Sequence, residues 1–416
     1  MKLFNKLLLI SSLAIASQAD SLKQVIDNTL NNNINLKSIE IQNKSLYKSY
    51  ESVQNSFNPN ITIGANYLKL DGDTRAVQIG STSTGFVKFS ANLYDGGKNS
   101  AIKKQKNYEY KASQQNSITS KKEMILQVVT LYFQAKTIQE NITVLEEKSK
   151  ALQAQYERIK TKYEIQMTTE DEVLKLKSEY ESNQYLIAEL KYQKESLLQN
   201  LSLLSNSTVT SLDNSTLPTI ENLIYKKSAS IKALELSIQS QNEAINIISS
   251  VYYPQLKIED NYNIYSYDDY NDKMLTDLPD QQNQLMLTLS FNLYDTSSSD
   301  KIEATKLAKI ASKQKKEYLK LQEKMKFELS KKNLMTQKYK INSLNSAVKM
   351  GNSVYDMVKI KYQNGIVDNI VYLDALSKKI YNIALYKQAL NDYEIAKANY
   401  FFSSGADYIK ILKLLD

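Results

Sequence analysis

The chain repeats itself once, at a spacing of about 200 residues. The recurring motifs are Phe57-Asn58-Pro59 with Tyr252-Tyr253-Pro254, Asn92-Leu93-Tyr94-Asp95 with Asn292-Leu293-Tyr294-Asp295, and Tyr156 and Tyr163 with Tyr355 and Tyr362. A unit this long exceeds any solenoid repeat, so it indicates a duplicated domain. We predict repeats over residues 20–204 and 219–404, a Ser/Thr/Asn-rich linker over 205–218, and a short tail over 405–416.

Both repeats predict the same order of long elements. The chain has only 9 Gly and 4 Pro, so few positions can interrupt a helix or strand. In the first repeat we expect helices over about 21–56, 98–163 and 170–204, and strands over about 60–70 and 85–95. In the second repeat we expect helices over about 219–250, 299–362 and 369–402, and strands over about 255–265 and 285–295.

The long helix of the first repeat has a heptad pattern of apolar residues. The seam consists of Val128, Leu131, Ala135, Ile138, Ile142, Leu145, Leu152, Tyr156, Ile159 and Tyr163, with Ser149 in the one polar place. Steps of three and four residues over five heptads predict coiled-coil packing along the helix. In each repeat the two shorter helices together match the length of the long one, which predicts a rod two helices wide.

The four strands alternate between apolar and polar residues. Val87, Phe89 and Ala91 share one face, and Lys88 and Ser90 the other. A continuous apolar face backed by a polar face is typical of a transmembrane barrel. Four strands cannot close a barrel, and open edges are not tolerated in lipid. Several chains must therefore pool strands, eight from a dimer or twelve from a trimer.

The first 19 residues predict a secretory signal peptide. Lys2 and Lys6 precede a short apolar run from Leu7 to Ala16, and Ser17 and Ala19 are the small residues that cleavage requires. The run is too short to cross a bilayer as a helix. We expect removal of residues 1–19.

Composition excludes most catalytic chemistry. The chain has no His and no Cys, so it lacks imidazole acid–base groups, thiol nucleophiles and disulfides. We predict no enzyme activity, no cofactor and no metal site. The acids of the loops, namely Asp71, Asp73, Asp268, Asp269 and Asp272, are expected to be solvated charges. The net charge of +8 is spread over interleaved Lys and Glu, which argues against nucleic-acid binding.

These features together resemble the TolC-type outer-membrane factor (outer-membrane efflux protein) family. The motifs that carry the resemblance are the prolines before the strands, Pro59 and Pro254, and the strand-exit residues Tyr94, Asp95, Gly96, Gly97, Tyr294 and Asp295. The second exit departs from the pattern because Thr296-Ser297 replaces the two glycines.

The resemblance implies a mainly α fold with a small β part. It also implies a homotrimer with a 12-stranded transmembrane β-barrel in outer-membrane lipid, continued by a long periplasmic α-helical barrel. The implied function is the exit duct of a tripartite efflux or type I secretion system. The implied partners are a periplasmic adaptor (membrane fusion) protein and an inner-membrane pump.

The resemblance further implies a closed aperture at the far tip of the helices. The candidate residues are Asp374, Glu172, Tyr362, Gly365 and Tyr163. Asp374 belongs either to a ring of acids at the aperture or to a solvated helix face, where the helix dipole favours an acid near the start. Glu172 is expected to accept a hydrogen bond from Tyr362. Gln166 stands where the second repeat has Gly365, which predicts an asymmetric tip.

A different class of protein is also compatible with the heptads, namely a periplasmic or surface coiled-coil spacer or adhesin. It would not explain the duplicated alternating strands. Cell fractionation distinguishes the two, because a spacer stays soluble whereas a duct is extracted from the outer membrane by detergent.

Overall fold

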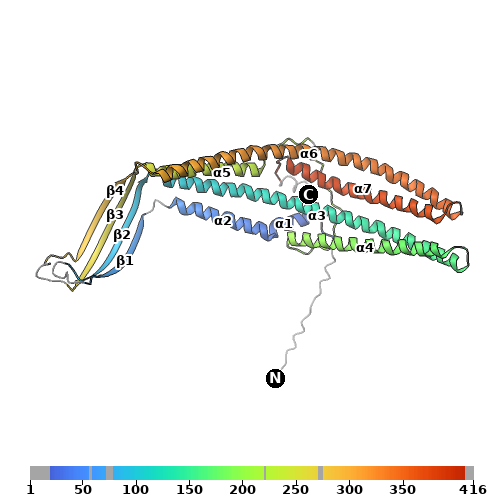
Figure 1. Cartoon of the computed structure of the whole chain (residues 1–416), viewed down its shortest axis with the longest axis horizontal. Helices are drawn as coiled ribbons and strands as arrows, with labels where there is room; N and C mark the ends of the chain where they lie inside the picture. The colour runs from blue at the N-terminus through green and yellow to red at the C-terminus, as the bar shows by residue number, and fades with distance from the viewer. Residues whose placement is uncertain (1–18, 56–58, 72–77, 220–221, 270–274, 408–416) are drawn as a thin grey trace, which may run out of the picture. The chain divides into compact units, whose positions relative to one another are not determined.

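The computed structural model describes residues 19–55, 59–71, 78–219, 222–269 and 275–407. The expected signal peptide falls almost entirely outside these residues, as do Phe57, Asp73, Asp272 and most of the expected tail. Within them the chain is mostly helical with one small sheet, as predicted (Figure 1). The elements are α1 (Leu22–Asn32), α2 (Ile34–Gln54), β1 (Asn60–Lys69), β2 (Ser81–Asp95), α3 (Lys98–Glu164), α4 (Glu170–Ser205), α5 (Ala229–Ser249), a short 3₁₀ turn (Ser250–Tyr252), β3 (Gln255–Asp268), β4 (Gln281–Ser290), α6 (Thr296–Gln363) and α7 (Asn369–Ser403).

The prediction of a single helix over residues 21–56 is wrong, because the segment is divided at Asn33 into α1 and α2. The backbone of Asn33 leaves the helical region. Its side chain replaces the missing helical bonds: the amide Nδ2 donates to the Leu204 carbonyl at 2.8 Å, and Oδ1 accepts from the Leu36 N–H at 3.0 Å. An Asn that bonds the backbone in this way competes with the helix and also caps the next one.

The helix expected from residue 219 is also wrong at its start, because α5 begins only at Ala229. The described residues of the preceding segment, 209–219 and 222–228, form an extended segment that we call the strap. Its backbone groups bond to α7 and the residue after it: the Leu223 N–H donates to the Tyr400 hydroxyl at 3.1 Å, and the Lys226 N–H donates to the Ser404 carbonyl at 2.8 Å. These tertiary bonds replace those that a helix would supply.

The four strands form one antiparallel sheet in the order β1-β2-β3-β4 (Figure 1). The outer strands β1 and β4 each have an unpaired edge within the described chain. β2 begins earlier and β3 ends later than expected, and β4 ends at Ser290 rather than at residue 295. One face of the sheet exposes large apolar side chains, among them Ile63, Leu287 and Leu289.

The apolar face of the sheet was expected to be continuous, but it is interrupted by Asp260 in the middle of β3. Asp260 is opposite Phe89 on β2 and Leu285 on β4. Directly opposed residues of an antiparallel pair share a face. The strand register therefore places one carboxyl group among the apolar residues.

The strand-exit motifs are helix caps. Asp95 accepts from the N–H groups of Gly97 and Asn99 at 3.1 and 2.7 Å, and so caps α3. Gly96 has φ +67°, and a Cβ there would lie 2.7 Å from the Ser250 carbonyl oxygen. Asp295 caps α6 by accepting from the Ser298 N–H and hydroxyl. These bonds lower the pKa of the Asp295 carboxyl.

The described chain forms two compact units. One contains residues 40–116 and 229–319 and includes the sheet. There α2 contacts α3 through Tyr47 and Tyr110, whose ring centroids are 5.3 Å apart. α5 contacts α6 through Gln241, whose amide donates to the Ser312 hydroxyl at 3.0 Å.

The other unit contains residues up to 39, 117–228 and from 320 onward. Its core joins α1, α3, α4, α7 and the strap through Leu22, Val25, Ile26, Ile125, Val128, Val129, Tyr132, Phe133, Leu198, Leu201, Val209, Leu217, Ala398 and Phe401. The hydroxyl of the buried Tyr132 lies 3.1 Å from the Asp20 carbonyl and 2.9 Å from the Asp213 carbonyl. Burial raises the pKa of Tyr132 to about 12, so it stays a neutral donor.

Candidate functional site at the interhelical turns

Two interhelical turns, one between α3 and α4 and one between α6 and α7, have the same backbone geometry. Gln166 has φ +59° and Gly365 has φ +72°. In the first turn the N–H of Met167 donates to the Lys162 carbonyl, and in the second the N–H of Ile366 donates to the Lys361 carbonyl. Both are left-handed helix ends of the Schellman type. Gln166 therefore adopts the conformation that Gly365 provides without strain, and the missing glycine does not change the turn.

Three tyrosines at the end of α6 and the start of α7, namely Tyr355, Tyr362 and Tyr372, form what we call the tyrosine cluster. The rings of Tyr362 and Tyr372 stack with centroids 4.9 Å apart. The hydroxyls of Tyr355 and Tyr372 are 3.1 Å apart. All three side chains are buried. Burial raises the pKa of both Tyr355 and Tyr362, so these two phenols are neutral at physiological pH.

The cluster also contacts α3, through residues that the sequence did not single out. The Tyr362 hydroxyl donates to Gln155 Oε1 at 3.4 Å, and the Arg158 guanidinium lies 5.2 Å from the centre of the Tyr362 ring. Arg158 is therefore placed for a cation–π contact. The heptad relation of Tyr355 to Tyr362 is visible in the sequence, but nothing in it indicates Gln155.

The expected hydrogen bond between Tyr362 and Glu172 is replaced by two others. Glu172 accepts from the Thr168 hydroxyl at 2.8 Å, within its own turn. Its charge still contributes to raising the pKa of Tyr362. Tyr163, at the matching place in α3, is 42% exposed and belongs to no such cluster.

Asp374 lies in the second turn of α7 with its side chain exposed. Its Oδ2 accepts from Lys378 Nζ at 2.8 Å, one helical turn further along. Any ring that Asp374 forms would therefore bring an equal number of lysines. The described residues include no group of three or more carboxylates placed to hold a metal ion.

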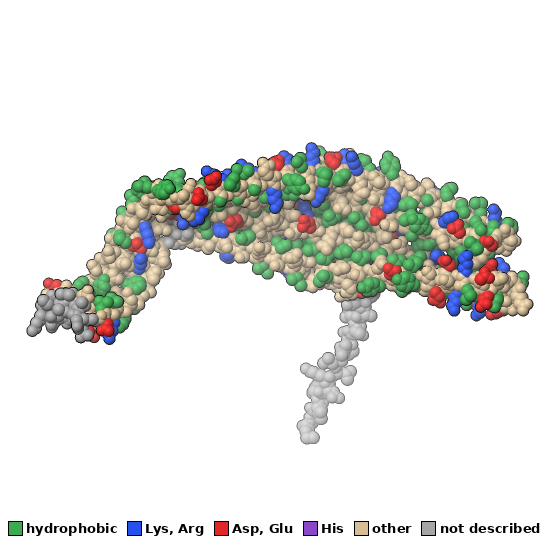
Figure 2. Space-filling model, in the orientation of Figure 1, with side chains coloured by type: hydrophobic (Ala, Val, Ile, Leu, Met, Phe, Trp, Pro, Cys, Tyr) green, Lys and Arg blue, Asp and Glu red, His purple; other side chains and the backbone are tan. Residues whose placement is uncertain are grey.

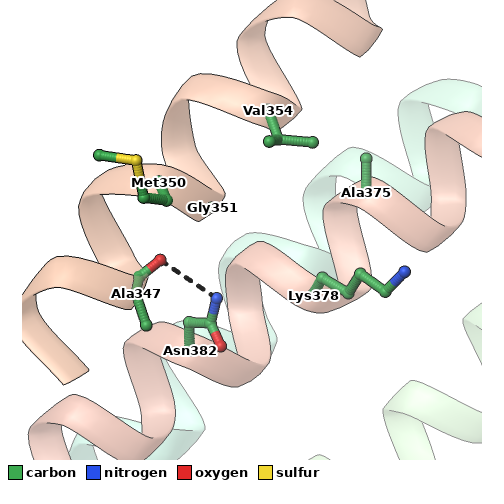
Figure 3. A pocket seen from close by; sticks show the side chains of 7 residues that line it. All are labelled: Ala347, Met350, Gly351, Val354, Ala375, Lys378 and Asn382. Carbon is green, nitrogen blue, oxygen red and sulfur yellow. Dashed lines mark hydrogen bonds between the residues drawn. The ribbon is translucent and has the colours of Figure 1, made fainter. Parts of the chain in front are cut away.

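A groove of about 390 Å³ lies between α6 and α7 beside this pair (Figure 3). Its lining residues are Ala347, Met350, Gly351, Val354, Ala375, Lys378 and Asn382. The Asn382 amide donates to the Ala347 carbonyl at 3.3 Å across its floor. A Cβ on Gly351 would lie 2.9 Å from Asn382 Nδ2, so the glycine keeps the helices close at this point.

The surface carries no large patch of one sign on the face drawn in Figure 2, where basic and acidic side chains alternate along the helices. Across the described part of the chain, no helix is both long and apolar enough to cross a bilayer. The alternating charges agree with the interleaved Lys and Glu of the sequence.

The fold is that of outer membrane channels. It matches the outer membrane protein VceC from Vibrio cholerae with a TM-score of 0.81, at 12% identity over 93% of this chain and 96% of that one. The Campylobacter jejuni CmeC outer membrane channel has a TM-score of 0.81 at 17% identity, over 92% of this chain and 85% of that one. The open state of the Neisseria gonorrhoeae MtrE outer membrane channel has a TM-score of 0.78 at 15% identity, over 93% and 89%.

The sequence comparison agrees with the fold. The family model described as "Outer membrane efflux protein" matches residues 25–207. No curated protein matches the sequence. The resemblance to the TolC-type outer membrane efflux protein family is therefore confirmed, and its members and structural neighbours are channels rather than enzymes.

Proposed function

We propose that three copies of this chain form the outer-membrane exit duct of a tripartite efflux or type I secretion machine. The observation that carries the proposal is the four-stranded sheet, which has two open edges and one exposed apolar face. Such a sheet is unstable in lipid until its edges are paired. Twelve pooled strands leave a lumen for the polar face, whereas eight would be filled by side chains.

The helices would continue the barrel into the periplasm and end at the two interhelical turns. These turns expose apolar side chains, including Ile165, Met167 and Ile366. With the groove between α6 and α7, they offer a surface for the helices of a periplasmic adaptor, which would in turn bind an inner-membrane pump. Transport through the duct would be passive.

The protein purified in detergent is expected to be a trimer, because twelve is the smallest multiple of four strands that closes a barrel with a lumen. Mass measurement of the detergent-solubilised, unheated protein tests this. Boiling should convert the trimer to monomers without crosslinks, since the chain has no Cys. A stable monomer or dimer as the main species would contradict the proposal.

The β3–β4 connection and the two interhelical turns are expected to lie in different compartments. Asp277→Cys, in the β3–β4 connection, should react with an impermeant thiol reagent in intact cells. Gln166→Cys and Asn364→Cys should react only after the outer membrane is permeabilised. The absence of native Cys makes each label specific. Equal labelling of all three variants in intact cells would refute this topology.

The Asp374–Lys378 pair is expected to control block of the channel by trivalent cations from the periplasmic side. Lys378→Gln leaves three uncompensated carboxylates at an aperture ring and should tighten the block by about ten-fold. Asp374→Asn should weaken it and leave the trimer intact, because an exposed ion pair contributes only about 0–1 kcal/mol. Planar-bilayer recordings test this. If neither substitution changes the block, Asp374 is a solvated surface acid and other residues form the aperture.

A further inference from the structure

The polar face of the sheet carries a compact cluster of three charged side chains. Glu259 on β3 forms ion pairs through its Oε1 with Lys88 Nζ on β2, at 2.8 Å, and with Lys257 Nζ on β3, at 2.9 Å. The register confirms that they share a face, because Glu259 is opposite Ser90 and Lys88 is opposite Asn261. We call these residues the strand charge cluster.

The lysines of this cluster are more accessible than the acid. The side chain of Glu259 is 14% exposed, whereas those of Lys88 and Lys257 are 39% and 46% exposed. Two ammonium groups share one carboxylate, so the cluster has a net charge of +1. Its accessible part is almost entirely cationic.

Within the four strands one other charge lies on this face by register, that of Asp95, which is opposite Gln255 at the end of β2. Its carboxyl is buried and already accepts from the N–H groups of Gly97 and Asn99. The remaining charged strand residues are Lys69, Asp260 and Asp268. Two of these are terminal residues of their strands. The third, Asp260, lies on the apolar face opposite Phe89 and Leu285. The interior of the polar face is therefore positive.

We infer that the strand charge cluster is a charge filter of the barrel lumen and that it favours anionic solutes. The inference rests on the proposed function, in which three sheets close with their polar faces inward. Three clusters would then form a ring of +3 around the lumen. Rings of charged side chains determine which ions a channel prefers. At low salt the field of such a ring extends about 30 Å, enough to span a lumen.

The Asp374–Lys378 pair near the interhelical turns does not oppose this preference for anions. Each Asp374 is accompanied by Lys378, so a ring of three pairs carries no net charge. The strand charge cluster therefore determines the sign of the selectivity, and anions or the anionic ends of amphiphilic molecules are the solutes it would pass most readily.

Reversal potentials of the purified trimer in planar bilayers test the filter. The gradient runs from about 0.01 M to about 0.1 M KCl, where the Debye length is about 30 to 10 Å. The variants change the net charge of the cluster without removing the backbone ladder of the sheet. Lys257→Gln makes it neutral and retains the Lys88–Glu259 pair, the double variant Lys88→Gln/Lys257→Gln makes it −1, and Glu259→Gln makes it +2.

The wild-type channel is expected to prefer anions. Lys257→Gln should lower the ratio of anion to cation permeability by about two-fold or more, since a charged channel holds a potential of at least one kT. The double variant should reverse the preference, and Glu259→Gln should raise it. All differences should vanish near 1 M salt, where the Debye length is about 3 Å. Lys69→Gln is the matched control, because it removes the same charge from the end of β1, on the other face, and should change nothing.

Two outcomes would overturn the filter while leaving the proposed function in place. One is a conducting trimer whose reversal potential is the same in the wild type and in all cluster variants. The other is a wild-type trimer that prefers cations. A wild-type protein that neither trimerises nor conducts would instead refute the proposed function itself.

Discussion

Gly405→Ala is expected to lower the free energy of unfolding by about 3 kcal/mol or more. Gly405 has φ +75°, and a Cβ there would lie 2.1 Å from the carbonyl oxygen of Lys226 in the strap. That oxygen belongs to the backbone, so it cannot move aside as a flexible side chain would. Either the strap must detach, with loss of the bond between the Lys226 N–H and the Ser404 carbonyl, or the end of α7 must shift.

The matched control for this substitution is Gly365→Ala. Gly365 has a similar φ of +72°, but a Cβ there would meet no atom within 4 Å. It should therefore cost only the backbone strain, about 1 kcal/mol. Guanidinium titrations followed by helical circular dichroism compare the two. Equal midpoints for both variants would show that the close approach of the strap to Gly405 does not matter for stability.

Lys397→Met is expected to destabilise the protein by about 3 kcal/mol. Lys397 and Glu394 form a buried pair at 2.8 Å on α7, with side chains 8% and 12% exposed. Glu394 accepts from the Leu217 N–H at 2.6 Å, and Lys397 donates to the Leu217 carbonyl. Loss of the lysine leaves a buried carboxylate without its counter-charge and a carbonyl without its donor.

A double substitution separates these causes. Glu394→Gln/Lys397→Met removes the uncompensated charge, while the side-chain amide oxygen introduced at position 394 retains an acceptor for the Leu217 N–H. The double variant should recover part of the stability that Lys397→Met loses, in the same guanidinium titration. If the double variant is instead less stable than Lys397→Met, the uncompensated charge of Glu394 is not the cause of the destabilisation.

Periodic features of the sequence were sufficient to predict most of the fold. α3 and α4 begin at the residues expected. The Gly96-Gly97 break before α3 and the end of its heptad seam at Tyr163 are local signals. The break at Asn33 was missed because its stabilising partner, the Leu204 carbonyl, lies 171 residues away. The start of α5 was missed for a similar reason, since the bonds that hold residues 222–228 extended come from α7 and the residue after it.

The candidate site could likewise be predicted from the sequence only where the signal is local. Gly365 could be predicted because a left-handed helix end demands a particular backbone, and Gln166 shows that the turn persists without glycine. The partner of Tyr362 could not, because Gln155 is 207 residues away and becomes its neighbour only when α3 and α6 pack. Asp260 and the strand charge cluster follow from strand parity once the register is known.

The attachment of the strap to α7 has a consequence for how the chain acquires its structure. The bonds of Leu217 and Leu223 to α7 join residues 177 to 180 positions apart. Contacts this distant in sequence form slowly, because the intervening chain must be ordered first. The strap and the core that it covers cannot form until α7 has been synthesised. Throughout that interval the apolar residues that α7 will cover stay exposed, so the chain is most prone to aggregation until α7 is complete.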